Sequence, residues 1–372
     1  MNTTPTARAG RDRSARRAPL WTPRRVLVTR SALEHEHGRA IVARCEAAGV
    51  AQIELLKGDR LPSLKAGDER TTYAAAKQTL AVTVAPPSKR RLQPIAPSAD
   101  WRFDLAEGCP AHCQYCYLAG SLTGPPITRA YANLEEILAG LDAAVGQGSV
   151  TSGTAARSAE GTTFEASCYT DPLGIEHVTG SLSAAVAHFG AHDWPGRVQL
   201  RFTTKYDQVE PLLTVDHGGR TRVRVSVNTG AVSERFEGGT AGVGARLAGA
   251  QRVAEAGYPV GLVIAPIMPV PGWREGYAQL LSQAAQALSG VPGLDLTMEC
   301  ITHRFTPGSK QTLLGWYPAT SLEMDEASRR EKRSKFGGVK HVYTKETMSE
   351  LRSGFEDLLA EHLPQARTLY WT

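Results

Sequence analysis

The segment GCPAHCQYCYL, residues 108–118, holds three of the six cysteines of the chain. Cys109, Cys113 and Cys116 have the spacing Cys-x3-Cys-x2-Cys. Thiolates are the ligands that hold iron–sulfur clusters in proteins. A cubane cluster contains four irons, so three cysteines on one loop would hold three of them and leave the fourth open. The spacing therefore predicts a [4Fe-4S] cluster whose open iron binds a cofactor or a substrate.

Two other uses of this loop stay open. A zinc ion would take His112 as its fourth ligand, although His112 is adjacent to Cys113 and the sequence has no second Cys-x2-Cys pair. Cys113 and Cys116 would otherwise form a redox-active disulfide. The full three-cysteine spacing, followed by an α/β chain, favours the iron–sulfur cluster.

The other three cysteines differ in their setting. Cys168 ends a short expected strand, residues 164–168. Side chains at the ends of strands line the active sites of α/β barrels, so this thiol is a candidate for chemistry. The alternative is a small buried side chain, which is how free cysteines often behave. Cys45 and Cys300 have no such setting, and we expect them in the core.

The elements that must position these residues follow from apolar periodicity. Strands and helices alternate after the cysteine loop, and about six such units fit a partial barrel better than a closed eightfold one. The apolar run 260–267 is typical of a strand buried on both faces. We therefore expect an α/β fold: a partial (β/α)6 barrel with an N-terminal α/β extension and a C-terminal β-hairpin plus helix. The polar residues 57–75 are expected to form a loop.

Four segments are expected along the chain. They are a disordered Arg-rich tail over residues 1–22, the N-terminal extension over 23–98, the partial barrel over 99–300 and a C-terminal segment over 301–372. Gly337-Gly338 is expected to turn the hairpin of the last segment.

Positive charge is concentrated at the N-terminus. The first 25 residues hold seven arginines and one acidic residue, a net charge of +6, whereas the whole chain has +5. Such a tail cannot bury enough apolar surface to fold alone, and it either contacts nucleic acid electrostatically or is dispensable. No stretch of 18 apolar residues and no secretory signal is present, so we expect a cytoplasmic protein without a membrane partner.

The three-cysteine loop at the start of a partial α/β barrel resembles the radical S-adenosylmethionine superfamily. The resemblance implies a barrel of that type and S-adenosyl-L-methionine bound to the open iron through its amino and carboxylate groups. One electron from the reduced cluster would break the S–C5′ bond and yield a 5′-deoxyadenosyl radical. A one-electron reductant, such as flavodoxin or ferredoxin, is the implied partner.

Longer segments resemble the spore photoproduct lyase family from about Thr22 to the C-terminus. The resemblance implies a monomeric DNA-repair lyase. It would revert spore photoproduct, 5-thyminyl-5,6-dihydrothymine, in UV-damaged DNA to two thymines. The segments that carry the resemblance are FEASCYTDPLGIEHVTGSL (164–182), LRFTTKYDQVEPLL (200–213), VRVSVNTGAVSERFEGGT (223–240), EAGYPVGLVIAPIMPVPGWREGY (255–277), THRFTPGSK (302–310) and, at the end of the chain, YPATSLEMDE (317–326), KFGGVKHVY (335–343) and YWT (370–372).

When the roles of the family's residues are assigned to the matching positions of this chain, the resemblance implies a radical pathway. Cys168 matches the hydrogen-atom donor that quenches the thymine allyl radical once the lesion has opened. A thiol suits this role because its S–H bond is weaker than most C–H bonds. Tyr117 and Tyr115 match tyrosines that relay the radical back to the cofactor. Plain packing is the alternative for both tyrosines.

The resemblance also implies contacts to the cofactor. Lys205, Ser226, Thr170 and Tyr115 match positions at the S-adenosylmethionine site. Thr170 stands where the family commonly has serine, so a hydroxyl is retained. The alternatives are a surface lysine at Lys205 and a turn serine at Ser226.

The C-terminal hairpin departs from the family pattern. Lys335, Phe336 and Gly337 match a lesion-opening motif in which Arg-Tyr-Gly is usual. Lysine loses the bidentate fork of arginine, whereas phenylalanine keeps a ring that can hold a flipped base out of the helix. Lys340 and its basic neighbours would meet phosphates, unless the segment is an ordinary solvated charged loop.

Two rival functions follow from these departures. One is a radical enzyme of the same superfamily that acts on another nucleic-acid or nucleotide substrate. The other is a non-catalytic iron–sulfur protein that binds DNA or senses redox state, which would have no use for Cys168.

Overall fold

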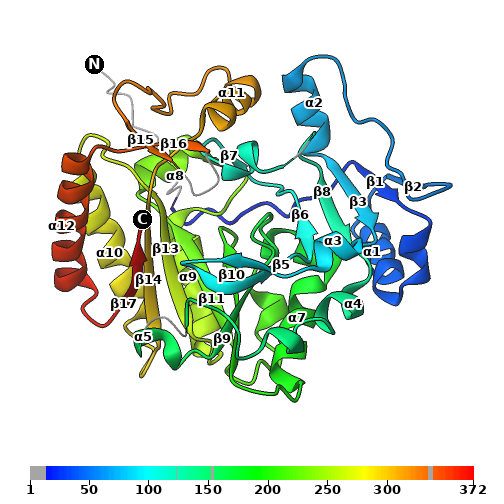
Figure 1. Ribbon diagram of the computed structural model, residues 1–372, viewed down its shortest axis with the longest axis horizontal. Helices are drawn as coiled ribbons and strands as arrows, with labels where there is room; N and C mark the ends of the chain where they lie inside the picture. Colours follow the sequence, from blue (N-terminus) through cyan, green and yellow to red (C-terminus); the bar gives the residue numbers. More distant parts are fainter. Residues whose placement is uncertain (1–13, 123, 152–154, 334–337) are drawn as a thin grey trace, which may run out of the picture.

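Eight strands form the larger of two sheets, which curls into a half-barrel (Figure 1). The computed structural model describes residues 14–122, 124–151, 155–333 and 338–372. All neighbouring strands of this sheet are parallel except the pair at the β4 edge, which is antiparallel. In spatial order the strands are β17 (Arg367–Trp371), β14 (Leu296–Thr302), β13 (Val260–Ile267), β11 (Thr221–Val227), β10 (Val198–Thr204), β9 (Thr162–Ala166), β5 (Ala99–Phe103) and β4 (Gln93–Ile95).

Helices follow these strands and cover the outer face of the half-barrel (Figure 1). The six parallel strands from β5 to β14 confirm the expected partial barrel. The apolar stripes predicted for its helices are buried, for example Leu182 and Phe189 in α7 and Leu247 and Val253 in α9. The helices between the strands of the barrel are α4 (Leu134–Leu138), α5 (Ala155–Ser158), α6 (Glu176–Thr179), α7 (Ser181–Ala191), α8 (Gly230–Phe236), α9 (Val243–Glu255) and α10 (Trp273–Leu288).

A second sheet of five strands lies beside the half-barrel (Figure 1). Its order is β2-β1-β3-β8-β6, so the N-terminal extension supplies three strands and the segment after residue 99 supplies two. Cys45 packs in the core of this part, and Cys300 packs in the barrel core, as expected. The elements are β1 (Arg25–Val28), α1 (Glu36–Ala47), β2 (Gln52–Leu55), α2 (Glu69–Ala76), β3 (Thr79–Thr83), α3 (Pro87–Arg90), β6 (Ala106–Glu107) and β8 (Thr128–Tyr131).

The C-terminal segment forms the expected hairpin and helix. Strands β15 (Arg330–Arg333) and β16 (Val339–Val342) pair antiparallel, and a bridge from Phe305 to His341 ties them to the body. The hairpin lies at the same end of the molecule as α8 and α11 (Pro307–Trp316), whereas α12 (Lys345–His362) packs beside α10 (Figure 1). Lys335, Phe336 and Gly337 lie outside the described residues.

Two expectations from the sequence are wrong in part. Residues 57–75 are not all loop, because 69–76 form α2, whose first turn is capped by the Asp68 carboxylate accepting from the Thr71 N–H at 2.7 Å. The expectation of disorder is wrong for residues 14–22. Arg17 pairs with Asp207 at 2.8 Å, and Ala18 is buried.

Within the residues that the structure describes, the helices lack the combination of length and apolar character that crossing a bilayer requires.

Candidate active site

The three-cysteine loop is held by a two-stranded ribbon at one end of the half-barrel. Strand β7 (His112–Cys113) pairs antiparallel with β12 (Glu237–Gly238), and this register places Glu237 opposite Cys113. Gly108 begins the loop with φ +77°, and a Cβ there would lie 1.9 Å from the Ile127 carbonyl oxygen. Only glycine fits both the conformation and the space.

A buried lysine holds the backbone of the cysteine loop. Lys77, at the end of α2, donates to the carbonyl oxygens of Cys109 and Ala111. Burial raises the pKa of Cys109 to about 12 and raises the pKa of Cys113 and Cys116. Thiols buried in this way become ligating thiolates only when a cation compensates them, as a metal cluster would. The donor set therefore fits an iron–sulfur cluster.

The two alternative uses of the loop gain no support. The His112 Nδ1 lies 3.2 Å from the Tyr73 hydroxyl, and burial lowers the pKa of His112 to about 4. Among the described residues, no three His, Cys, Asp or Glu side chains are arranged to hold a single ion. A cubane does not need such convergence, because each thiolate binds a different iron. All six cysteines, each within the described residues, are free thiols, including Cys113 and Cys116.

Lys205 and Ser226 come together at the carboxyl ends of neighbouring strands. Lys205 directly follows β10, and Ser226 lies near the end of β11. The Lys205 Nζ donates to the Ser226 Oγ at 2.7 Å and to a Glu237 carboxylate oxygen at 3.0 Å. The ammonium is thus fixed on the side of the barrel that faces the cysteine loop.

Glu237 is the centre of this network, although it was not among the site residues expected from the sequence. Its carboxylate accepts from the Arg246 guanidinium at 2.6 Å and from the Tyr115 hydroxyl, in addition to Lys205. Burial opposes its ionisation, but Arg246 and Lys205 outweigh burial and hold the pKa of Glu237 well below its ordinary value. The one available signal was its position just before Gly238-Gly239, which lets β7 approach closely.

The loop after β9 supplies Thr170 and Asp171 to the same region. The Asp171 carboxylate accepts from the backbone N–H of Lys205 at 2.7 Å and from that of Gly174 at 3.3 Å. Burial raises the pKa of Asp171 to about 6. The Thr170 hydroxyl is buried and has no hydrogen-bond partner among the described residues. Buried hydroxyl groups without a hydrogen-bond partner are rare, and this one is free to form a hydrogen bond with a bound polar ligand.

Cys168 lies in a turn that begins at the end of β9. Ser167 has φ +57°, which is uncommon for a residue other than glycine and is typical of functional sites. The Arg102 Nη1 donates to the Cys168 Sγ at 3.5 Å, and the same guanidinium lies 4.3 Å from the ring centroid of Tyr169. Burial raises the pKa of the Cys168 thiol to about 12, so the thiol keeps its hydrogen at neutral pH.

The two candidate relay tyrosines point to different partners. Tyr115 donates to Glu237 and is half-buried, and its ring lies 5.6 Å from the Lys205 Nζ. Tyr117 is 56% exposed, and its ring centroid lies 6.4 Å from that of Tyr169, next to Cys168. The structure thus places Tyr117, and not Tyr115, on the side of Cys168.

Lys340 lies in a basic part of the hairpin. It is exposed and stands directly opposite Lys332 in the β15–β16 register. Although the residue is exposed, the part of its side chain that the protein covers loses solvation, and this loss, together with the nearby charges of Arg304 and Lys332, lowers the pKa of Lys340. Like charges opposite one another destabilise a hairpin unless an anion lies between or beside them.

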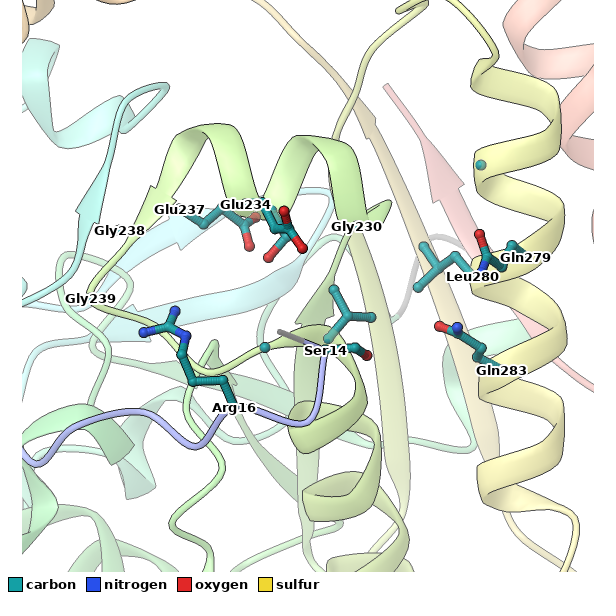
Figure 2. A pocket seen from close by; sticks show the side chains of 14 residues that line it. Ser14, Arg16, Gly230, Glu234, Glu237, Gly238, Gly239, Gln279, Leu280 and Gln283 are labelled. Atoms are coloured by element: carbon teal, nitrogen blue, oxygen red, sulfur yellow. The ribbon is translucent and has the colours of Figure 1, made fainter. Parts of the chain in front are cut away.

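A separate pocket of about 440 Å³ lies behind Glu237. Figure 2 shows Glu234 and Glu237 on one side, Arg16 from the N-terminal segment below them, and Gln279 and Gln283 of α10 opposite. None of the site residues expected from the sequence lines this pocket, and Glu237 is the side chain that separates it from Lys205.

Comparisons with known proteins agree with this architecture. The family model described as spore photoproduct lyase matches residues 21–372. The chain is 37% identical to a spore photoproduct lyase of Geobacillus sp. (strain Y412MC61) and 36% identical to one of Bacillus subtilis (strain 168). Each match covers 95% of this chain and 99% of the relative.

Solved structures give the same result. A double mutant of spore photoproduct lyase with bound AdoMet and dinucleoside spore photoproduct matches with a TM-score of 0.86 and 35% identity. A spore photoproduct lyase complexed with dinucleoside spore photoproduct matches with a TM-score of 0.85 and 35% identity. Both matches cover 95% of this chain and all of the solved chain. The chain therefore belongs to the spore photoproduct lyase family.

Proposed function

We propose that the chain is a DNA-repair lyase that reverts spore photoproduct to two thymines by radical S-adenosylmethionine chemistry. The observation that carries the proposal is the arrangement at one end of the half-barrel. The three-cysteine loop, the Lys205–Ser226–Glu237 network and Cys168 all lie at or beside the carboxyl ends of β9 to β11. Relatives of known structure bind AdoMet and dinucleoside spore photoproduct, and this chain matches them over 95% of its length.

The cofactors are assigned from the donor sets. Cys109, Cys113 and Cys116 would hold the [4Fe-4S] cluster, with Lys77 compensating its charge. Lys205 and Ser226 would hold S-adenosyl-L-methionine beside the cluster, and the orphan Thr170 hydroxyl would meet one of its polar groups. The Tyr115 hydroxyl would act indirectly, through Glu237. When bound, the cluster and cofactor supply a 5′-deoxyadenosyl radical.

Cys168 would complete the repair. Once a hydrogen has been taken from the lesion and its methylene bridge has broken, one thymine remains as an allyl radical. The Cys168 S–H bond breaks, the hydrogen atom joins the thymine, and the unpaired electron stays on sulfur. Tyr117 would then carry the radical back toward the cofactor, because it lies beside Tyr169 and Cys168.

The hairpin would hold the damaged strand. Lys332 and Lys340 face each other across the hairpin with Arg304 nearby, and phosphate would relieve their mutual repulsion. Lys335 and Phe336, where the family pattern has arginine and tyrosine, would enter at the lesion. A one-electron reductant such as flavodoxin or ferredoxin, a cytoplasmic location and a monomeric state complete the proposal.

The lesion assay tests this function directly. Anaerobically reconstituted protein with a chemical reductant and S-adenosylmethionine should convert dinucleotide spore photoproduct to thymidylyl-thymidine, measured by chromatography. A Cys113→Ala variant should neither cleave S-adenosylmethionine nor repair. If that variant still cleaved S-adenosylmethionine, the assignment of Cys113 as a cluster ligand would be wrong.

One second candidate has a specific observation in its favour. Lys335 and Phe336 depart from the Arg-Tyr pattern, which favours a radical enzyme of the same superfamily acting on another nucleic-acid or nucleotide substrate. Cofactor cleavage by the wild-type protein without repair of the dinucleotide would support this candidate. A redox sensor is disfavoured, because it has no need of the thiol held at Cys168.

A further inference from the structure

Arg102 connects the strand that leads into the cysteine loop with the turn that carries Cys168. It lies in β5, and its side chain is 19% exposed. Its Nη1 lies 3.5 Å from the Cys168 Sγ and 3.7 Å from an Asp104 carboxylate oxygen, while its planar group lies 4.3 Å from the Tyr169 ring centroid. The ion pair and the cation–π contact both limit where the guanidinium can lie.

The backbone fixes the same arrangement. β5 and β9 are parallel neighbours, with Arg102 in register with Glu165 and Phe103 with Ala166. Beyond β9, the Ser167 N–H donates to the Phe103 carbonyl oxygen at 2.7 Å, and the Ser167 hydroxyl accepts from the Leu105 N–H at 2.8 Å. The left-handed backbone of Ser167 is therefore anchored to the segment that follows Arg102, which places the Cys168 Cα at a fixed distance from β5.

The chemistry of the contact is specific. A guanidinium has only donors, so it can bind the sulfur only by donating an N–H to a sulfur lone pair. The thiol hydrogen is left free to point elsewhere. Burial raises the pKa of Cys168 to about 12, with Asp104 and Glu165 adding to burial and Arg102 opposing it. Arg102 therefore does not produce a thiolate, which would have no hydrogen atom to give.

We propose that Arg102 is a positioning residue that, with the ring of Tyr169, directs the Cys168 S–H toward the product radical. This inference rests on the proposed function. In the step that it serves, the S–H bond breaks homolytically, a C–H bond forms on the thymine methylene, and a thiyl radical and a closed-shell thymine remain. A misdirected thiol leaves the allyl radical unquenched, so the loss appears in the products rather than in lesion opening.

The test compares product distributions at equal extents of lesion opening. Arg102→Ala should still cleave S-adenosylmethionine and open the lesion within about threefold of the wild-type rate, but should raise the fraction of by-products about tenfold. Because thiol hydrogens exchange with solvent, repair in D2O should place deuterium in the wild-type product, and Arg102→Ala should lower that fraction. Arg102→Lys keeps the charge but not the planar fork, so its by-product fraction should lie between the two.

Two further variants keep the test decisive. Tyr169→Leu removes the ring on which Arg102 stacks and should raise by-products, whereas Tyr169→Phe keeps the ring and should give fewer. Arg25→Ala breaks a half-exposed ion pair with Glu54 in the other sheet and is the matched control.

The outcomes separate the two levels of the proposal. If the wild-type protein does not open the lesion, the proposed function fails and this inference falls with it. A second outcome is that the wild-type protein repairs the lesion, while Arg102→Ala and Tyr169→Leu give the same product ratio and deuterium content as the wild type. In that case only the positioning role of Arg102 is overturned. If Arg102→Ala fails to fold, Tyr169→Leu decides.

Discussion

Glu237 shows how one buried carboxylate can set the charge of a whole site. Its two oxygens receive the Lys205 ammonium, the Arg246 guanidinium and the Tyr115 hydroxyl, and all of these groups are shielded from water to a large degree. Removing the carboxylate charge leaves two cations without compensation, which is the costly way to break a buried ion pair.

Glu237→Gln should therefore lower the free energy of unfolding by about 3–5 kcal/mol. Urea denaturation measured by circular dichroism checks this value. Glu356→Gln is the matched control, because it breaks an exposed ion pair with Arg352 and should cost less than about 1 kcal/mol. Equal losses in the two variants would contradict the central role of Glu237.

Asp104 gives a prediction for pH. Burial raises its pKa to about 6, although Arg102 opposes the shift. A carboxyl whose pKa is raised by folding stabilises the protein only while protonated, so its contribution is lost as pH rises from about 4 to about 6. Asp104→Asn removes this loss. The stability of the variant relative to the wild type should rise by about 1 kcal/mol between pH 5 and pH 7 in urea titrations. If the stability of the variant relative to the wild type is constant or falls over this range, folding does not raise the pKa of Asp104.

At the scale of elements, the N-terminal segment 14–18 acts as a strap across the barrel. The Ser14 hydroxyl accepts from the Gly244 N–H at 3.0 Å at the start of α9, and Arg16 donates to the Thr240 carbonyl oxygen at 2.9 Å. Arg17 and the backbone of Ala18 both bind the Asp207 carboxylate. The family match begins at residue 21, so these contacts lie outside the matched part of the chain.

Two truncated chains isolate the strap. A chain that starts at residue 19 should unfold at lower denaturant than one that starts at residue 14, with a loss of about 2 kcal/mol. It gives up the Ser14 hydrogen bond at the start of α9, and it leaves the buried Asp207 carboxylate without the Arg17 and Ala18 donors. Its affinity for S-adenosylmethionine should also fall, since the strap holds the 238–242 loop that follows Glu237. If the two chains have the same stability and the same affinity for S-adenosylmethionine, segment 14–18 contributes to neither.

The elements themselves were largely predictable from the sequence, because burial of one helix face or of both strand faces leaves a local period. Leu247 and Val253 in α9 and the run in β13 show this. The partners of the site were not predictable in the same way. Glu237 meets Tyr115 across 122 positions, and Lys77 meets Cys109 across 32, so no local pattern records either contact. Arg102 lies in an ordinary strand, and only the register with β9 brings it to Cys168.

At the scale of the whole molecule, the positive charge that could hold DNA is local. The first 25 residues carry +6 and the chain carries +5, so the rest of the chain is almost neutral. Binding to DNA should then depend on a few groups, among them Lys332 and Lys340, and not on a broad field.

The salt dependence of DNA binding measures how many phosphate contacts the protein makes. In fluorescence anisotropy with a lesion-containing duplex, Lys332→Gln together with Lys340→Gln should reduce the slope of log K against log salt by about 2, one for each lost phosphate contact. Lys65→Gln, an exposed lysine of the N-terminal extension, should leave the slope unchanged. A slope that is insensitive to both hairpin lysines would place the DNA elsewhere.

In the ribbon of β7 and β12, Cys113 stands opposite Glu237. One pair of strands thus joins the proposed cluster ligands to the proposed S-adenosylmethionine site. If binding on one side of the ribbon orders the other side, the effect on the two binding free energies is equal in both directions. In a cell exposed to oxygen, damage to the cluster should also release the cofactor. Conversely, a saturating concentration of the cofactor should slow the loss of the cluster.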